Sequence, residues 1–225
     1  MTFLKVIQWV VWKDLISEMR SRETLSSMLF FALIVILVFS FSFAMDQDAA
    51  QQLIAGIIWV SFAFTGIIGL GKSFSAELQN DALEYLQMSP APKGAIYLGK
   101  MFGNLLFMLI VEVMLFPLFV LFFNLDIVEE IGLLLLIFLL ATLGLSAVGT
   151  LFSALTVQIR AREVMLPVLL LPLAIPVLIA AVEATRGALD AQPLALYSHW
   201  IELLTIFDII FTVASFWLFE LILDT

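Results

Sequence analysis

The sequence predicts an all-α polytopic membrane protein with six transmembrane helices, and its composition and charge distribution are the reasons. Of the 225 residues, 63% are hydrophobic and only 13% are charged, with a mean hydropathy of +1.14. Soluble domains are closer to half apolar and a quarter charged. Nine of the ten basic residues fall in three clusters separated by long apolar stretches. This pattern predicts a single transmembrane domain, residues 1–225, with a fixed orientation in the membrane.

About 20 predominantly apolar residues are needed to cross the roughly 30 Å hydrocarbon core of a bilayer. The predicted spans are residues 24–45, 49–71, 101–123, 131–157, 164–182 and 203–223. The third span contains Glu112, and the sixth contains Asp208 and Glu220, whereas the other four are uncharged. The first span begins too late, and behind too polar a segment, to be a cleaved signal peptide. The absence of cysteine excludes disulfides, thiolate metal sites and a cysteine nucleophile.

The basic residues predict which side of the membrane each loop occupies. They lie in the amino-terminal segment (Lys5, Lys13, Arg20, Arg22), in the loop after the second span (Lys72, Lys93, Lys100) and in the loop after the fourth (Arg160, Arg162). Only Arg186 falls on the opposite side. Basic residues of short loops stay in the cytoplasm, so both termini are expected there, in a bacterial inner membrane. The net charge of −9 is scattered over both sides and gives no reason to expect a nucleic-acid partner.

The amino-terminal segment, residues 1–23, is expected to be a cytoplasmic interfacial helix. Residues 3–20 contain neither proline nor glycine, and the basic side chains gather on one arc opposite an interrupted apolar arc. Trp9 and Trp12 suit the membrane interface, where indole rings prefer to lie. Two interpretations remain open: a helix lying on the inner leaflet, or a juxtamembrane helix packed on the bundle.

The longest cytoplasmic loop, residues 72–100, is expected to contain an amphipathic helix over residues 74–87. Glu77, Asp81 and Glu84 form an acidic stripe opposite an apolar arc. Pro90 and Pro92 follow the helix and end it. The stripe is either a solvated face or a docking face for a basic surface of a cytoplasmic partner. The candidate docking residues are Phe74, Glu77, Leu78, Asp81, Glu84, Tyr85 and Leu86. Where the chain re-enters the membrane at the end of this loop, the spacing of Gly99 and Gly103 suits close helix packing.

Residues 66–73, GIIGLGKS, match the phosphate-binding P-loop pattern but are not expected to bind a nucleotide. The pattern has meaning only between a strand and a helix of a soluble α/β domain. Here an uncharged membrane span leads into it. Lys72 is instead expected to extend toward the inner membrane interface.

A few polar or helix-bending residues are candidates for a transport pathway or its gating. Glu112 is expected in the middle of a span, where a carboxylate is a functional candidate. Pro167, Pro172 and Pro176 each remove a helical hydrogen bond and give the fifth span possible bending points. His199, the only histidine, is a weak candidate for an axial heme ligand on the outer side. The residues indicate no catalytic group and no metal site.

Three stretches carry a family resemblance. The most specific is residues 149–181, GTLFSALTVQIRAREVMLPVLLLPLAIPVLIAA. Residues 56–60, GIIWV, and the loop 74–92, with its LQNDALEYL core and Pro-x-Pro ending, add to it. Together they resemble the heme exporter protein B (CcmB) family, membrane subunits of an ABC-type complex in cytochrome c maturation. Ala82 departs from that pattern, because a glycine is common there, and implies a stiffer helix.

The resemblance implies an ABC-2 permease-like subunit that pairs with a second copy of itself. It also implies a separate ATPase subunit (CcmA-like), CcmC-like and CcmD-like membrane proteins, and a CcmE-like heme chaperone. ATP would then bind only in the partner subunit, and heme would be a transported or handled ligand. The expected function is to couple ATP hydrolysis to heme export or to release of the heme-loaded chaperone on the outer face.

Two alternatives to this function remain. The chain could be a passive membrane scaffold that holds the heme-handling partners together without moving. It could also be an intramembrane enzyme that uses Glu112 and Asp208 as acid and base. The sequence argues against the enzyme, because it places Glu112 near mid-membrane and Asp208 nearer the outer face.

Overall fold

The computed structural model describes residues 2–43, 47–74, 91–125, 127, 129–157, 159 and 161–223. Its elements in chain order are α1 (Phe3–Ser21), α2 (Glu23–Ser42), α3 (Gln47–Lys72), α6 (Lys93–Phe123), α7 (Ile131–Thr156), α8 (Arg162–Leu189), the 3₁₀ helix η1 (Leu194–Leu196) and α9 (Ser198–Leu223). The described residues contain no strand, and six of these helices are long and apolar enough to cross a membrane. The predicted all-α class with six spans is confirmed.

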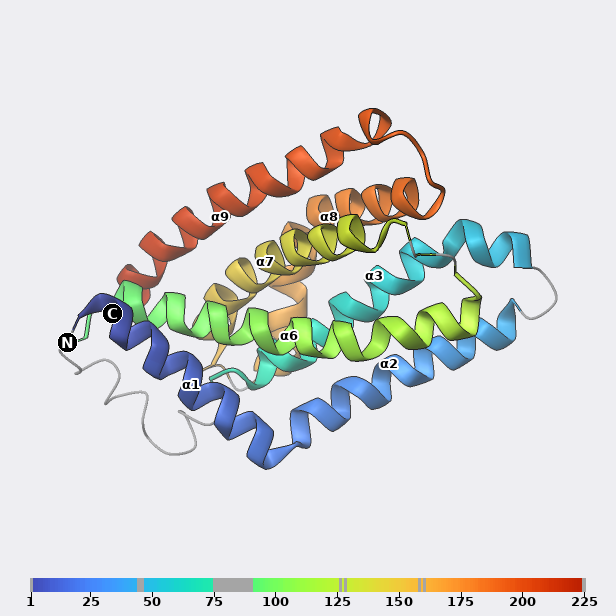
Figure 1. The fold of residues 1–225 in the computed structure, drawn as a ribbon. Helices are drawn as coiled ribbons and strands as arrows, with labels where there is room; N and C mark the ends of the chain where they lie inside the picture. Colours follow the sequence, from blue (N-terminus) through green and yellow to red (C-terminus); the bar gives the residue numbers. More distant parts are fainter. Residues whose placement is uncertain are drawn as a thin grey trace.

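The six long helices form one elongated bundle (Figure 1). We call the end where α1 and α6 begin and α9 ends the inner end, and the opposite one the outer end. Both chain termini lie at the inner end, as an even number of spans requires (Figure 1). At the outer end, α8 joins α9 through η1.

Three helices extend beyond the predicted spans by five residues or more. The helix α6 begins at Lys93 rather than 101, α8 continues to Leu189 rather than 182, and α9 begins at Ser198 rather than 203. Apolar length marks where the hydrocarbon core ends, whereas a helix continues as long as its backbone is bonded and its side chains find contacts. The first turns of α6 show the reason, because Ala95 and Tyr97 have no exposed surface. Residues 93–100 are therefore helix and not loop.

The helix α1 turns sharply into α2 at Arg22. This residue has a φ of 54°, and its backbone N–H donates to the Glu18 carbonyl at 2.9 Å, which closes α1. The backbone of Arg22 also begins α2, since its carbonyl accepts from the Ser26 N–H at 3.0 Å. One residue thus separates the two helices and sets the corner between them (Figure 1).

One face of α1 packs on α6. A Cβ added to Gly99 would lie 2.7 Å from the Cβ of Val10 and 3.3 Å from the Ile7 carbonyl oxygen. The predicted role of Gly99 in close packing is thereby confirmed, and α1 is the partner. Trp9 and Trp12 lie on the opposite face, each more than 60% exposed. Of the two interpretations of this segment, packing on the bundle is observed, and contact of the tryptophan face with the membrane interface stays a prediction.

The helix α7 lies at the centre of the bundle and packs against α3, α6, α8 and α9. Small and hydroxyl residues make this possible. The Ser146 hydroxyl donates to the Met101 carbonyl of α6 at 2.7 Å, and the Ser153 hydroxyl donates to the Leu70 carbonyl of α3 at 2.7 Å. In a membrane, helices associate through such close packing and interhelical hydrogen bonds, because lipid removes the hydrophobic drive.

An aromatic cluster fills the bundle between α3, α7 and α8. Trp59 is 1% exposed and meets the rings of Phe62 and Phe138 edge to face, at centroid distances of 5.7 Å each. Its indole N–H donates to Thr185 Oγ1 of α8 at 2.9 Å, so the one polar atom of the ring is satisfied. This pair connects the second and fifth spans across the core.

We predict that Gly99→Val destabilises the protein by about 1 to 3 kcal/mol, because the added carbons overlap Val10 and the Ile7 backbone, neither of which can rotate away. The melting temperature of the detergent-solubilised protein measures this. Gly132→Val is the matched control, since it adds the same side chain to a helix where nothing lies within 4 Å. Equal losses in the two variants would contradict the close α1–α6 packing.

Candidate functional site

Of the residues predicted to dock an ATPase, only Phe74 belongs to the described part of the chain. Glu77, Leu78, Asp81, Glu84, Tyr85 and Leu86 lie outside the described residues. Phe74 follows α3 and is 5% exposed. Its ring lies 6.5 Å from that of Phe219 on α9. The aromatic side chain at the start of the predicted docking segment is therefore anchored in the inner end of the bundle.

A buried lysine lies directly beside Phe74. Lys100 is 1% exposed, and its Nζ lies 4.8 Å from the centre of the Phe74 ring. The ammonium donates to the Ser73 carbonyl at 2.8 Å and forms an ion pair with Asp14 Oδ2 on α1 at 3.1 Å. The sequence placed Lys100 only within a basic cluster. Its position between Gly99 and Gly103 was the available signal, because those glycines bring α1 close enough to supply a carboxylate.

Glu112 is buried in the middle of the bundle, as the sequence predicts. It is 3% exposed, and its Oε1 accepts a hydrogen bond from Thr142 of α7 at 2.6 Å. Its second oxygen is buried and has no hydrogen-bond partner among the described residues. A carboxylate in this position is a functional candidate by default, since burial without full pairing is costly.

The expectation that Asp208 lies near the outer face is wrong. Asp208 is 5% exposed and lies against Gly144, whose added Cβ would be 2.7 Å from Asp208 Oδ1. Gly144 is close to the middle of α7, and so is Thr142, which binds Glu112. The error arose because α9 starts at Ser198, which moves Asp208 deeper along its helix. Neither oxygen of Asp208 has a hydrogen-bond partner within the described part of the chain.

The two buried carboxyls do not form an acid–base pair. They contact α7 at Thr142 and Gly144, and residues two apart on an α-helix point about 200° apart. Glu112 and Asp208 therefore lie at similar depth on opposite flanks of α7. The hypothesis of an intramembrane enzyme is disfavoured because α7 lies between the two carboxyls. The difference in depth that the sequence indicated is not the reason.

Residues 66–72 of the P-loop-like pattern form the last turns of α3, and Ser73 follows in a turn. The helix continues to Lys72, with no strand before it and no loop that could surround a phosphate. Gly66 instead makes room for Met108 of α6, whose Cε would lie 2.5 Å from an added Cβ. Lys72 is half exposed at the inner end, 3.9 Å from Glu23.

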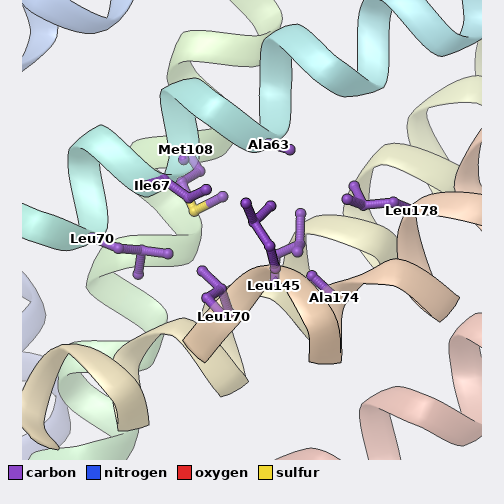
Figure 2. A pocket seen from close by; sticks show the side chains of 10 residues that line it. Ala63, Ile67, Leu70, Met108, Leu145, Leu170, Ala174 and Leu178 are labelled. Atoms are coloured by element: carbon purple, nitrogen blue, oxygen red, sulfur yellow. The ribbon is translucent and has the colours of Figure 1, made fainter. Parts of the chain in front are cut away.

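A narrow apolar crevice lies between α3, α6, α7 and α8 (Figure 2). Its lining includes Ala63, Leu70, Met108, Leu145 and Leu170, whose side chains converge on it (Figure 2). All of its lining residues are apolar, and the space between them that a water-sized molecule could enter is only about 10 Å³, about enough for one water molecule. Small-molecule sites typically measure about 300 to 1,000 Å³ and contain some polar groups. This crevice does not fit heme.

The other candidates lie in α8 and at the outer end. The helix α8 continues through Pro167, Pro172 and Pro176, so all three are interior helix positions. Their bending during transport stays a prediction. His199 is exposed in the first turn of α9, with its ring 4.7 Å from that of Trp200. The described residues contain no group of three metal-ligating side chains, and the lone histidine could supply one axial ligand at most.

These observations define a multi-pass integral membrane protein whose buried charges lie at mid-depth around α7 and at the inner end beside α1. The chain belongs to the CcmB protein family, whose sequence model matches residues 3–219. It is 32% identical over 186 residues to heme exporter protein B of Pseudomonas aeruginosa, covering 83% of this chain and 82% of that protein. Heme exporter protein B of Haemophilus influenzae is 30% identical, covering 84% and 83%, and that of Rhodobacter capsulatus is 28% identical, covering 77% and 79%.

We predict that Thr142→Val destabilises the protein by about 1 to 3 kcal/mol. The substitution removes the hydroxyl that donates to Glu112 Oε1, and this oxygen stays buried without a donor. Chemical denaturation in detergent measures the loss. Thr205→Val is the matched control, since that exposed hydroxyl donates only to the Ile201 carbonyl of its own helix. A control that loses as much stability as Thr142→Val would show that Glu112 does not depend on this bond.

Proposed function

We propose that this chain is the membrane permease subunit of an ABC-type complex for cytochrome c maturation in the bacterial inner membrane. In this complex, ATP hydrolysis by a separate subunit drives heme export or the release of a heme-loaded chaperone on the outer face. The observation that carries the proposal is membership of the CcmB family, together with relatives named heme exporter protein B. The helical form of the P-loop-like residues supports a separate ATPase.

The inner end is the side proposed to face the cytoplasm and the ATPase. The basic clusters of the sequence support this orientation. In the proposed complex, the acidic stripe of Glu77, Asp81 and Glu84 faces basic residues of the ATPase, and Phe74 holds the start of that segment in the bundle. The partners are the ATPase, a second copy of this chain and the heme-handling subunits that the resemblance implies.

The crevice between α3, α6, α7 and α8 offers no path for heme within the part of the chain that the structure describes. The crevice between α3 and α8 is too small and too apolar for a porphyrin with its carboxylates. We therefore assign heme handling to the interfaces between subunits. His199 is the one imidazole of this chain that could contribute there, at the outer end.

Reversing the charges of Glu77, Asp81 and Glu84 to lysine should weaken association with the ATPase subunit by about tenfold or more, because like charges would then face each other. Co-purification of the two subunits from membranes measures this. The matched control reverses three exposed outer-end acids, Glu129, Asp190 and Glu202, and so changes the net charge equally. If both triple variants retain the ATPase, the docking stripe is wrong.

The proposed orientation has a separate test, because the chain contains no cysteine that would have to be removed first. Thr2→Cys and Gln192→Cys place single thiols at exposed positions of the inner and outer ends. We expect a membrane-impermeant maleimide to label position 192 in spheroplasts and position 2 only in inverted vesicles. The reverse pattern would overturn the orientation.

A passive scaffold is distinguished from a permease by movement. A permease subunit changes its helix separations when the partner ATPase binds ATP, whereas a scaffold does not. Distances between labels on α2 and α8, measured in the complex with and without nucleotide, separate the two functions.

A further inference from the structure

Lys100 is the most deeply buried charged side chain in the described part of the protein, at 1% exposure. Among the described residues it contacts two separate segments: α1 through the Asp14 carboxylate, and the turn after α3 through the Ser73 carbonyl and the face of the Phe74 ring. A buried ammonium is stable only where nearby groups replace its lost hydration, so these segments are held around it. Lys100 itself lies on α6, and therefore connects α6 to both.

Two other ion pairs at the inner end are more exposed to water than the pair of Lys100 and Asp14. Lys13 also pairs with Asp14, at 3.0 Å, but is 53% exposed. Lys72 and Glu23 are 3.9 Å apart, at 48% and 78% exposure. Exposed pairs of this kind contribute little, because water and salt screen them. Of the ion pairs between described residues, the pair of Lys100 and Asp14 is the most shielded from water, and it can therefore hold helices in a fixed relation.

The backbone positions these groups independently of the charges. Gly99 and Gly103 bring α1 against α6, and a Cβ added to Gly103 would lie 3.7 Å from the Asp14 Cβ. Phe74 is the first residue of the segment proposed to dock the ATPase, and Ser73 directly precedes it. The contacts of Lys100 thus connect the beginning of the docking segment to the amino-terminal helix α1.

We propose that Lys100 is a positioning residue that makes α1, the end of α3 and the start of α6 move as one unit. When the ATPase displaces the docking segment, the displacement reaches α1 through Ser73, Lys100 and Asp14. From α1 it passes to the first span, α2, through the corner at Arg22. The fixed unit follows from the geometry alone. Its use in coupling rests on the proposed function.

The first test uses the purified chain without any partner. The double variant Lys100→Met with Asp14→Leu removes both charges and leaves no unpaired buried ion, so it is expected to fold. Spin labels at Trp12→Cys and Phe102→Cys, both at exposed positions of α1 and α6, report the separation of the two helices. We expect a broader distance distribution in the double variant and an unchanged one in the control Lys13→Met. An unchanged distribution in the double variant would overturn the fixed unit.

The second test measures coupling in the assembled complex. In the double variant we expect heme-loaded chaperone released per ATP hydrolysed to fall by about fivefold or more, while the ATPase still co-purifies. A residue with only a structural role would instead lower the amount of complex and leave this ratio unchanged. If the double variant releases as much chaperone per ATP as the wild-type chain, the coupling role is overturned. If the wild-type chain binds no ATPase, the proposed function is overturned, and the first test remains valid.

A disulfide can replace the ion pair in the same complex. The Cβ separation of 3.7 Å suits a cysteine pair at positions 14 and 103, since disulfides span about 3.5 to 4.5 Å between Cβ atoms. In the variant Lys100→Met, Asp14→Cys, Gly103→Cys, we expect oxidation to raise the release per ATP above that of the reduced form but below the wild-type value, because the disulfide restores the link between α1 and α6 and not the contact with Ser73. The reduced form of the same protein is its own control. A ratio that does not change with oxidation would contradict transmission through α1 and α6.

Discussion

The structure depends on how closely α7 approaches its neighbours. Lipid surrounds the bundle, so apolar burial does not drive helices together, and contact must come from small residues and interhelical hydrogen bonds. Ser146 and Ser153 donate to carbonyls of α6 and α3, and Gly144 leaves room for Asp208 of α9. Three spans are thus positioned by one helix. The depth and separation of the two buried carboxyls follow from this arrangement.

The buried charged side chains of this bundle have two different environments. One oxygen of Glu112 and both oxygens of Asp208 are buried without a hydrogen-bond partner among the described residues, on opposite flanks of α7. Lys100 has partners on α1 and after α3, as expected for a group that fixes its surroundings. The first kind lies at mid-depth and the second beside the proposed ATPase contact. This separation is consistent with a permease that receives force at one level and responds at another.

Apolar runs and basic clusters predicted the number of spans and the class of protein, and residues 149–181 predicted the family. The ends of the helices were predicted less well. The first turns of α6 carry Lys93 and Lys100 and were assigned to a loop, because charge marks the edge of the hydrocarbon core and not the end of a helix. For the same reason, the sequence predicted Asp208 to lie closer to the outer face than it does. The position of Glu112 inside the bundle was predicted correctly, because a charge inside a long apolar run is visible without knowing its neighbours.

By itself, the sequence determined the six spans, the family and the location of most charges, because hydropathy and motif patterns are local properties of the chain. The tertiary structure alone decided that Lys100 pairs with Asp14, that Trp59 binds Thr185, and that α7 separates Glu112 from Asp208. These are contacts between residues tens of positions apart, and they depend on which faces of the helices meet. Helix faces are chosen by packing of small residues such as Gly99 and Gly144, which a periodic apolar pattern does not reveal in a helix that is apolar on all sides.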